Sequence, residues 1–160
     1  MARTTRIDST GVDPAPSTAA VLRHPVHPML VPFPLAFLVG ALATDLAFWS
    51  TDDAFFARAS LWLVGTGVVT GLIAAGIGLV DFLTIARARE HAMGWIHALG
   101  NAAALALSLV SWLLRLGDSA SAIMPWGLTL SLVVAAILGI TGWAGGELSY
   151  RHRIGVMREP

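Results

Sequence analysis

The chain lacks cysteine and lysine and has few charged residues of either sign. Without cysteine, disulfides, thiolate metal sites, iron–sulfur ligation and cysteine nucleophiles are excluded. All ten basic residues are arginines, so a Schiff-base lysine and a phosphate-loop lysine are excluded as well. The net charge is zero, which offers no basic stripe for nucleic acid. Histidine, aspartate, glutamate and arginine remain as the residues able to do chemistry.

The composition is that of a protein that lies in lipid. Charged residues make up 12% of the 160 residues, about half the share usual in soluble domains, and 56% are hydrophobic. This leaves too little polar surface to cover a soluble globule. Four apolar runs, residues 29–49, 59–82, 95–116 and 126–148, each approach the roughly 20 residues that cross a bilayer as a helix. We predict an all-α fold, a polytopic membrane four-helix bundle.

The polar segments flank and connect these runs. Residues 1–22 mix arginine, aspartate, glycine, proline, serine and threonine without periodicity, which predicts a disordered N-terminal tail. Residues 23–156 then form the transmembrane domain, and residues 157–160 form a short C-terminal tail.

Arginine is divided unequally between the two ends of the predicted bundle. With four spans, both termini and the link at 84–94 share one end, called side A here, while the links at 50–58 and 117–125 share side B. Eight of the ten arginines lie on side A, and only Arg58 and Arg115 lie on side B. Because cytoplasmic loops are enriched in arginine, we predict a multi-pass protein of the inner (plasma) membrane with cytoplasmic termini.

All five histidines lie on side A or just inside it. They are His24 and His27 before the first span, His91 and His97 around the start of the third, and His152 after the fourth. Two carboxylates, Asp81 and Glu147, reach the same level at the ends of the second and fourth spans. Each half of the chain thus begins with two histidines and ends with a carboxylate. This weak duplication predicts His27 with Asp81 and His97 with Glu147 as equivalent pairs.

Two His-Pro pairs lead into the first span, and Pro32 and Pro34 continue the pattern. Because proline favours extended backbone in the residue before it, we predict a stiff, non-helical entry that carries His24 and His27.

Polar residues also lie inside the predicted spans. His97, Asn101, Ser108, Ser111 and Arg115 follow one another at helical spacing along the third span. Such a seam is costly in lipid, so we expect it to face the other helices. Asp45 lies toward side B in the first span, away from every histidine, in a region within reach of Arg58 or Arg115.

These residues resemble a known family. The segment HPVHPMLVPFP at 24–34, GLVD at 78–81 and GWAGGEL at 142–148 are similar to bacterial membrane proteins grouped as domain of unknown function 2231. The resemblance runs from about residue 24 to 156 and implies a four-helix membrane domain. Some relatives are joined to Rieske-type iron–sulfur domains, which implies membrane redox chemistry. Since this chain has no cysteine, any such partner is a separate protein.

Three functions fit this pattern. The first is binding of b-type haem for electron transfer, with His27 and His97 as axial ligands and His24, His91 and His152 in a second site or around the first. The second is a non-haem transition metal held by histidines and carboxylates: His24, His27, His91, His97, Asp81 and Glu147. The third is an accessory or scaffold subunit whose polar cluster is proton-linked. In each case the bilayer is the environment, partners are a redox protein, a quinone or further copies, and catalysis by the chain alone is not expected.

Overall fold

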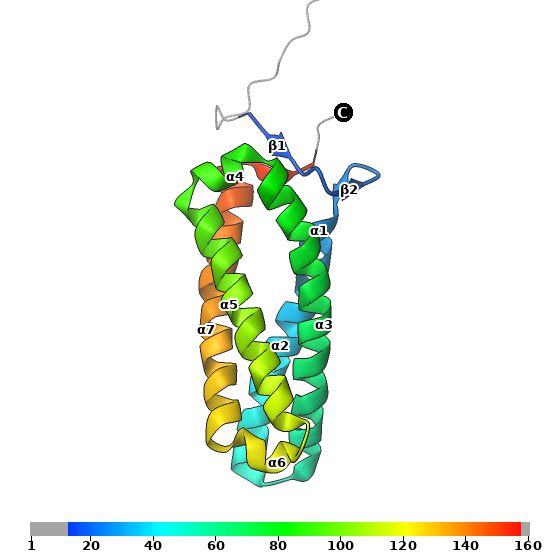
Figure 1. Ribbon diagram of the computed structural model, residues 1–160, viewed down its shortest axis with the longest axis vertical. Helices are drawn as coiled ribbons and strands as arrows, with labels where there is room; N and C mark the ends of the chain where they lie inside the picture. Colours follow the sequence, from blue (N-terminus) through cyan, green and yellow to red (C-terminus); the bar gives the residue numbers. More distant parts are fainter. Residues whose placement is uncertain (1–12, 158–160) are drawn as a thin grey trace, which may run out of the picture.

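Four long helices lie side by side in the computed structural model, which describes residues 13–157 (Figure 1). They are α2 (Pro32–Thr51), α3 (Ala54–Thr84), α5 (Ala92–Arg115) and α7 (Leu128–Gly146). Short helices adjoin them: α1 (Val26–Leu30), α4 (Ala86–Glu90) and α6 (Ser119–Ala122), with π-helical turns η1 (Ile123–Gly127) and η2 (Glu147–Arg151). The predicted all-α four-helix fold is confirmed.

The helices join into four spans that are long and apolar enough to cross a membrane. These spans are Val26–Thr51, Ala54–Thr84, Ala92–Arg115 and Ser119–Arg151. Tryptophans with exposed side chains lie near both ends of the bundle: Trp49, Trp62 and Trp126 toward side B, and Trp95 and Trp143 toward side A. Such positions suit an amphipathic ring at the level of the lipid headgroups.

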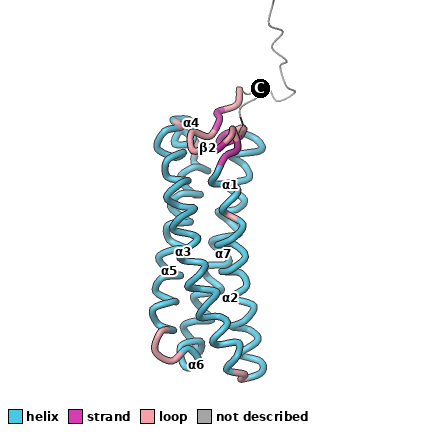
Figure 2. The backbone as a smooth tube through the Cα atoms, turned by 90° about the vertical axis from the view of Figure 1, so that its right-hand side faces the viewer, coloured by secondary structure: helices cyan, strands magenta, loops and turns pink. Residues whose placement is uncertain are grey.

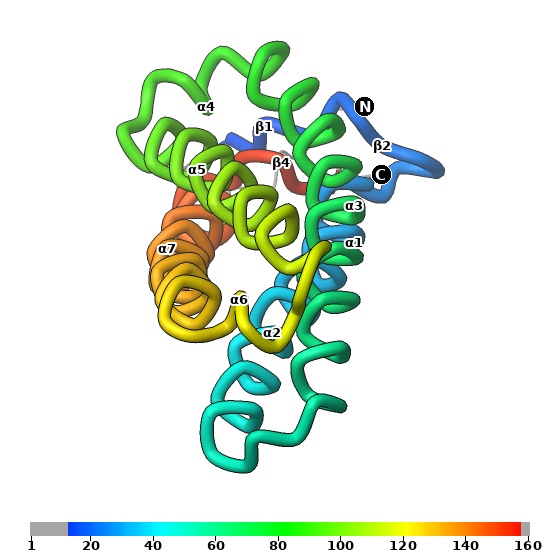
Figure 3. The backbone as a smooth tube through the Cα atoms, turned by 60° about the horizontal axis from the view of Figure 1, so that its bottom comes forward, coloured from blue at the N-terminus to red at the C-terminus, as the bar shows by residue number. Residues whose placement is uncertain are grey.

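The bundle consists of two hairpins. α2 packs mainly against α3, and α5 packs mainly against α7, while α3–α5 and α2–α7 contacts join the two pairs (Figures 2 and 3). Close approach depends on small residues, since a Cβ on Gly71 would lie 2.5 Å from Leu105 of the other hairpin. In lipid, where apolar surface drives no association, such close packing is the main source of helix–helix stability.

Carboxylates begin two of the helices at side B. Asp53 accepts a hydrogen bond from the backbone N–H of Phe55 at the start of α3, and Asp118 does the same for Ala120 and Ser121 at the start of α6. The N–H groups of Ser121 and Ala120 lower the pKa of the Asp118 carboxyl. These caps satisfy helical N–H groups that have no partner within the helix.

Four short strands cover the side A end. β1 (Ala15–Pro16) pairs in parallel with β4 (Ile154–Val156), and β2 (Ala20–Val21) pairs antiparallel with β3 (His24–Pro25). The first and last described segments therefore lie together on the end of the bundle (Figure 2). Residues 13–22, which composition assigned to a tail, pack here, while 1–12 and 158–160 lie outside the described residues.

The entry to the first span differs from the prediction, because residues 26–30 are helical. His27 lies in the first turn of α1 although Pro28 follows it. Proline has no N–H, but in the first turn of a helix that N–H has no partner to lose. Only His24, in β3, keeps the extended backbone that was expected.

Candidate functional site

Two histidines meet in the side A half of the bundle. His27 comes from α1 in the first hairpin and His97 from α5 in the second. Their ring centroids lie 6.0 Å apart, and the ring planes cross at 88°. Both side chains are partly buried. The structure therefore brings together, from distant parts of the chain, the two residues that the sequence favoured as axial ligands.

Each of these rings is held by the backbone of a neighbouring helix. The Nδ1 atom of His27 lies 2.9 Å from the carbonyl oxygen of Ala74 in α3, and that of His97 lies 2.9 Å from the carbonyl oxygen of Thr141 in α7. A carbonyl oxygen only accepts, so Nδ1 carries the hydrogen in both rings. In the neutral imidazole, Nε2 is then left with its lone pair, which is the form that binds metals.

Glycines make room for both rings. Gly78 lies one turn after Ala74, and a Cβ there would lie 2.7 Å from the His27 ring. Gly145 lies one turn after Thr141, and a Cβ there would lie 2.9 Å from the His97 ring. Any larger residue at either position would push the imidazole away from its carbonyl. The same arrangement of histidine, carbonyl and glycine thus occurs once in each hairpin.

The His97 ring has further support on its own side. Asn101, one turn along α5, donates from Nδ2 to the backbone carbonyl of His97 at 2.7 Å. The hydroxyl of Thr141 donates to Oδ1 of Asn101 at 3.3 Å. The predicted polar seam of α5 therefore faces α7 at this level, as expected.

Asp81 does not pair with His27. Its carboxylate accepts four hydrogen bonds from the segment before β2: from the Ser17 hydroxyl at 2.7 Å, the Thr18 N–H at 2.8 Å, the Thr18 hydroxyl at 3.0 Å and the Ala19 N–H at 3.0 Å. We call this contact the Asp81 clasp. It fixes residues 17–19 to the last turns of α3, so the carboxylate has a structural partner that the sequence did not indicate.

The remaining predicted site residues lie in separate places. Glu147 pairs with Arg151 along η2, and His24 bonds through Nδ1 to the carbonyl of Leu22 at the surface. His91 and His152 stack with ring centroids 4.0 Å apart. Within residues 13–157, no group of three or more histidine, aspartate or glutamate side chains is placed to hold a metal ion. The seven predicted residues therefore form one histidine pair, one histidine stack and three separate contacts.

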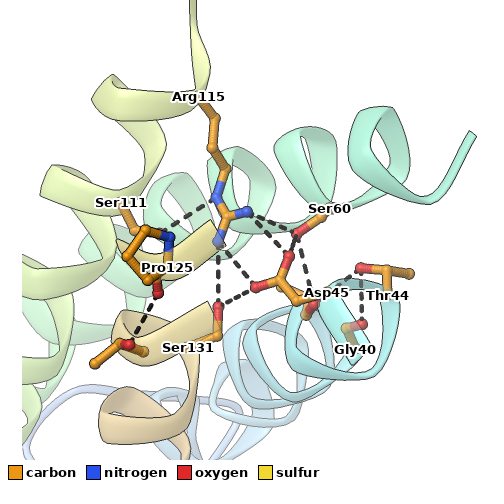
Figure 4. A network of polar contacts seen from close by, with 10 residues as sticks. Gly40, Thr44, Asp45, Ser60, Ser111, Arg115, Pro125 and Ser131 are labelled. Carbon is orange, nitrogen blue, oxygen red and sulfur yellow. Dashed lines mark hydrogen bonds and ion pairs between the residues drawn. The ribbon is translucent and has the colours of Figure 1, made fainter. Parts of the chain in front are cut away.

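A second buried cluster lies toward side B (Figure 4). Asp45 of α2 and Arg115 of α5 are fully buried and joined by two hydrogen bonds, Nη1 to Oδ1 at 3.0 Å and Nη2 to Oδ2 at 2.9 Å. Of the two arginines expected within reach of Asp45, it is Arg115 that pairs with it. We call this cluster the buried ion pair.

Serines complete the hydrogen bonding of this pair. Ser60 of α3 donates to Oδ1 of Asp45 at 2.5 Å and accepts from Nη1 of Arg115, while Ser131 of α7 donates to Oδ2 at 2.6 Å and accepts from Nη2. Nε of Arg115 donates to Ser111. All five N–H groups of the guanidinium thus have acceptors, and all four long helices contribute. The sequence predicted the seam on α5 but gave no sign that Ser60 and Ser131 would join it.

The two clusters follow the same internal repeat. Asp45 lies 18 residues after His27, and Arg115 lies 18 residues after His97. Ser60 and Ser131 each lie near the side B end of the second long helix of their hairpin. The structure therefore supports the duplication suggested by the sequence, although backbone carbonyls, not carboxylates, are the partners of the two histidines.

This geometry defines a multi-pass helical membrane protein with two interhelical polar clusters, one ionic and one made of imidazoles. The chain belongs to the family described as "Predicted membrane protein (DUF2231)", which matches residues 23–158. A search of curated proteins found no match, and a search of solved structures found none either.

Proposed function

We propose that this protein binds b-type haem between His27 and His97 and carries electrons in the membrane. One observation carries the proposal: two imidazoles from different hairpins lie with their ring centroids 6.0 Å apart, each with Nδ1 bonded to a backbone carbonyl. Metal-binding histidines characteristically donate their other ring N–H in this way.

The two rings lie close enough together for both to hold one metal. Imidazole nitrogen binds a transition metal at about 2.0 Å, so two rings that share a metal have centroids within roughly 6 Å of each other. The centroids of His27 and His97 are 6.0 Å apart. Haem iron is commonly held by histidine, and bundles build cofactor sites from side chains on facing helices.

Backbone carbonyls and neighbouring helices of this chain would tune the reduction potential of a haem bound at this pair. The carbonyls of Ala74 and Thr141 fix the tautomer and orientation of the two rings and raise the basicity of Nε2. Both rings are partly buried between apolar helices, and a low local dielectric influences a reduction potential. Bound haem would supply the one-electron carrier that amino-acid side chains cannot provide.

The proposal includes an orientation. The excess of arginine on side A favours a cytoplasmic location for that end, and the histidine pair lies in the half of the bundle nearest to it. Electrons would then be exchanged near the cytoplasmic headgroups, with a separate redox protein or a quinone as partner.

The test is an absorption spectrum of the detergent-purified protein, oxidised and then reduced with dithionite, with metal analysis of the same sample. We expect a Soret band that shifts on reduction and stoichiometric iron. His27→Ala and His97→Ala should each abolish the band, because either change removes one of the two histidines that would hold the haem.

His24→Ala is the matched control, since His24 is exposed and bonds only locally. It should leave the spectrum unchanged. If the wild type shows no Soret band but contains stoichiometric metal, the group bound at this histidine pair is a non-haem metal ion. A protein with neither, or full haem content in both histidine variants, would contradict the proposal.

A further inference from the structure

A β-hairpin at the side A end has chemistry that the haem proposal does not use. β2 and β3 pair Val21 with His24, so Leu22 and Arg23 form the turn between them. Both turn residues have left-handed backbone, with φ of 49° and 69°. Two such residues in succession make a tight hairpin turn, and residues with side chains adopt this conformation at a cost in free energy. The turn therefore displays Leu22 and Arg23 in a fixed arrangement.

The tip of this hairpin is amphipathic. Val21 is 64% exposed and Leu22 is 87% exposed, so the protein covers neither side chain. Arg23 is also exposed, and its guanidinium has no hydrogen-bond or ion-pair partner within residues 13–157. An uncovered apolar pair thus lies next to an unpaired positive charge. We call residues 20–24 the hairpin tip.

A hollow opens at the base of the hairpin tip. Its volume is about 360 Å³, and it is lined by Ser17, Thr18, Ala20 and Arg23. The nearby carboxylate of Asp81 already accepts four hydrogen bonds from residues 17–19. Arg23 therefore supplies the unpaired charge of the hollow, and this charge is positive. A volume of this size is large enough for a phosphate-sized headgroup.

The hairpin tip lies at the side A end of the four spans. The Thr18 hydroxyl bonds to that of Thr84 in the last turn of α3, which places this segment at the very end of the second span. The interfacial Trp95 lies just inside the same end of the bundle. Figure 1 shows the hairpin extending sideways beyond α3, away from the bundle axis. In a bilayer, that direction leads to the surrounding lipid.

We propose that the hairpin tip binds an anionic phospholipid, with Arg23 pairing with the phosphate and Val21 and Leu22 lying against the upper acyl chains. Lipid is the occupant that matches both halves of the site, because a free phosphate would leave the two apolar side chains in water. A basic residue next to apolar side chains at the membrane surface is a typical arrangement for binding anionic lipid.

The experiment is native mass spectrometry of the full chain released from mild detergent after equilibration with equal amounts of phosphatidylglycerol and phosphatidylcholine. We expect the wild type to retain phosphatidylglycerol over phosphatidylcholine by about fivefold, the effect of one arginine near a membrane surface. Arg23→Gln should bring the ratio near one. Arg23→Lys should keep the preference, since lysine also binds phosphate as a point charge.

Arg58→Gln is the matched control, because it removes the same charge from an exposed position at side B. It should leave the ratio unchanged. Leu22→Ser should weaken retention of phosphatidylglycerol by removing the acyl contact. Equal retention of the two lipids by the wild type, or equal losses in Arg23→Gln and Arg58→Gln, would overturn the proposal. Complete displacement of the lipid by excess inorganic phosphate would also overturn it, because the hollow would then be a free-anion site.

Discussion

Single glycines decide whether the two histidine rings can lie where they do. We predict that Gly78→Ala and Gly145→Ala each destabilise the protein by about 1–3 kcal/mol, the usual cost of forcing extra atoms into a packed site. The reason is that the new Cβ would lie 2.7 Å or 2.9 Å from an imidazole. Denaturant titration of the purified protein measures the change, and haem content should fall with it.

The same helices offer the controls for this prediction. A Cβ on Gly76 of α3 or on Gly142 of α7 would meet nothing within 4 Å. Since alanine favours a helix over glycine by up to about 1 kcal/mol, Gly76→Ala and Gly142→Ala should be neutral or stabilising. If all four variants behaved alike, the rings would not depend on these glycines.

The sequence predicted which two histidines lie together but not the backbone carbonyls that hold their rings. His97 stood out because it lies on a predicted membrane helix and His27 because it is the natural partner from the other half of the chain, and the structure does bring them together. Their partners were missed because a backbone carbonyl has no residue type that could reveal it. The carboxylates predicted instead, Asp81 and Glu147, bind residues 17–19 and Arg151.

At the scale of helices, the buried ion pair joins all four long elements at one point. We predict that Asp45→Leu destabilises the protein by about 3–5 kcal/mol, because it leaves the charge of Arg115 buried without a partner. The double variant Asp45→Leu/Arg115→Leu should recover most of this loss, since no uncompensated charge remains. Unfolding in a graded mixture of detergents, fitted as a double-mutant cycle, measures both changes.

Arg58→Leu serves as the control for this cycle. Arg58 is exposed at the same end of the bundle, and its replacement should change stability by less than about 0.5 kcal/mol. Additive effects of Asp45→Leu and Arg115→Leu would show that the two side chains do not act as a pair.

A second prediction at the scale of helices concerns the Asp81 clasp. Asp81→Ala removes the acceptor of four hydrogen bonds that hold residues 17–19 against α3. The segment before the first span should then open more often, so trypsin should cut after Arg23 at least tenfold faster. Glu90→Ala, which removes an exposed carboxylate at the same end, should leave the cleavage rate unchanged. Equal rates in wild type and Asp81→Ala would mean that the clasp does not restrain this segment.

At the scale of the whole molecule, composition predicted the four spans but not the short strands that cover the side A end of the bundle. Runs of about 20 apolar residues have few alternatives to a membrane helix, so their number could be predicted. Residues 17–19 are held by Asp81, more than 60 residues away in the chain. A contact of that range leaves no local pattern, and composition alone therefore suggested only a tail.

The orientation that the arginine distribution predicts can be tested directly, because the chain has no cysteine of its own. We predict that a membrane-impermeant maleimide labels Gly117→Cys in intact cells but labels Glu90→Cys only after the membrane is opened. Both positions are exposed, and they lie at opposite ends of the bundle, between α5 and α6 and at the end of α4. The expected asymmetry has a physical cause, since arginine-rich segments are retained on the cytoplasmic side during insertion. Labelling of Glu90→Cys in intact cells would reverse the orientation, and it would move both the histidine pair and the hairpin tip to the outer face.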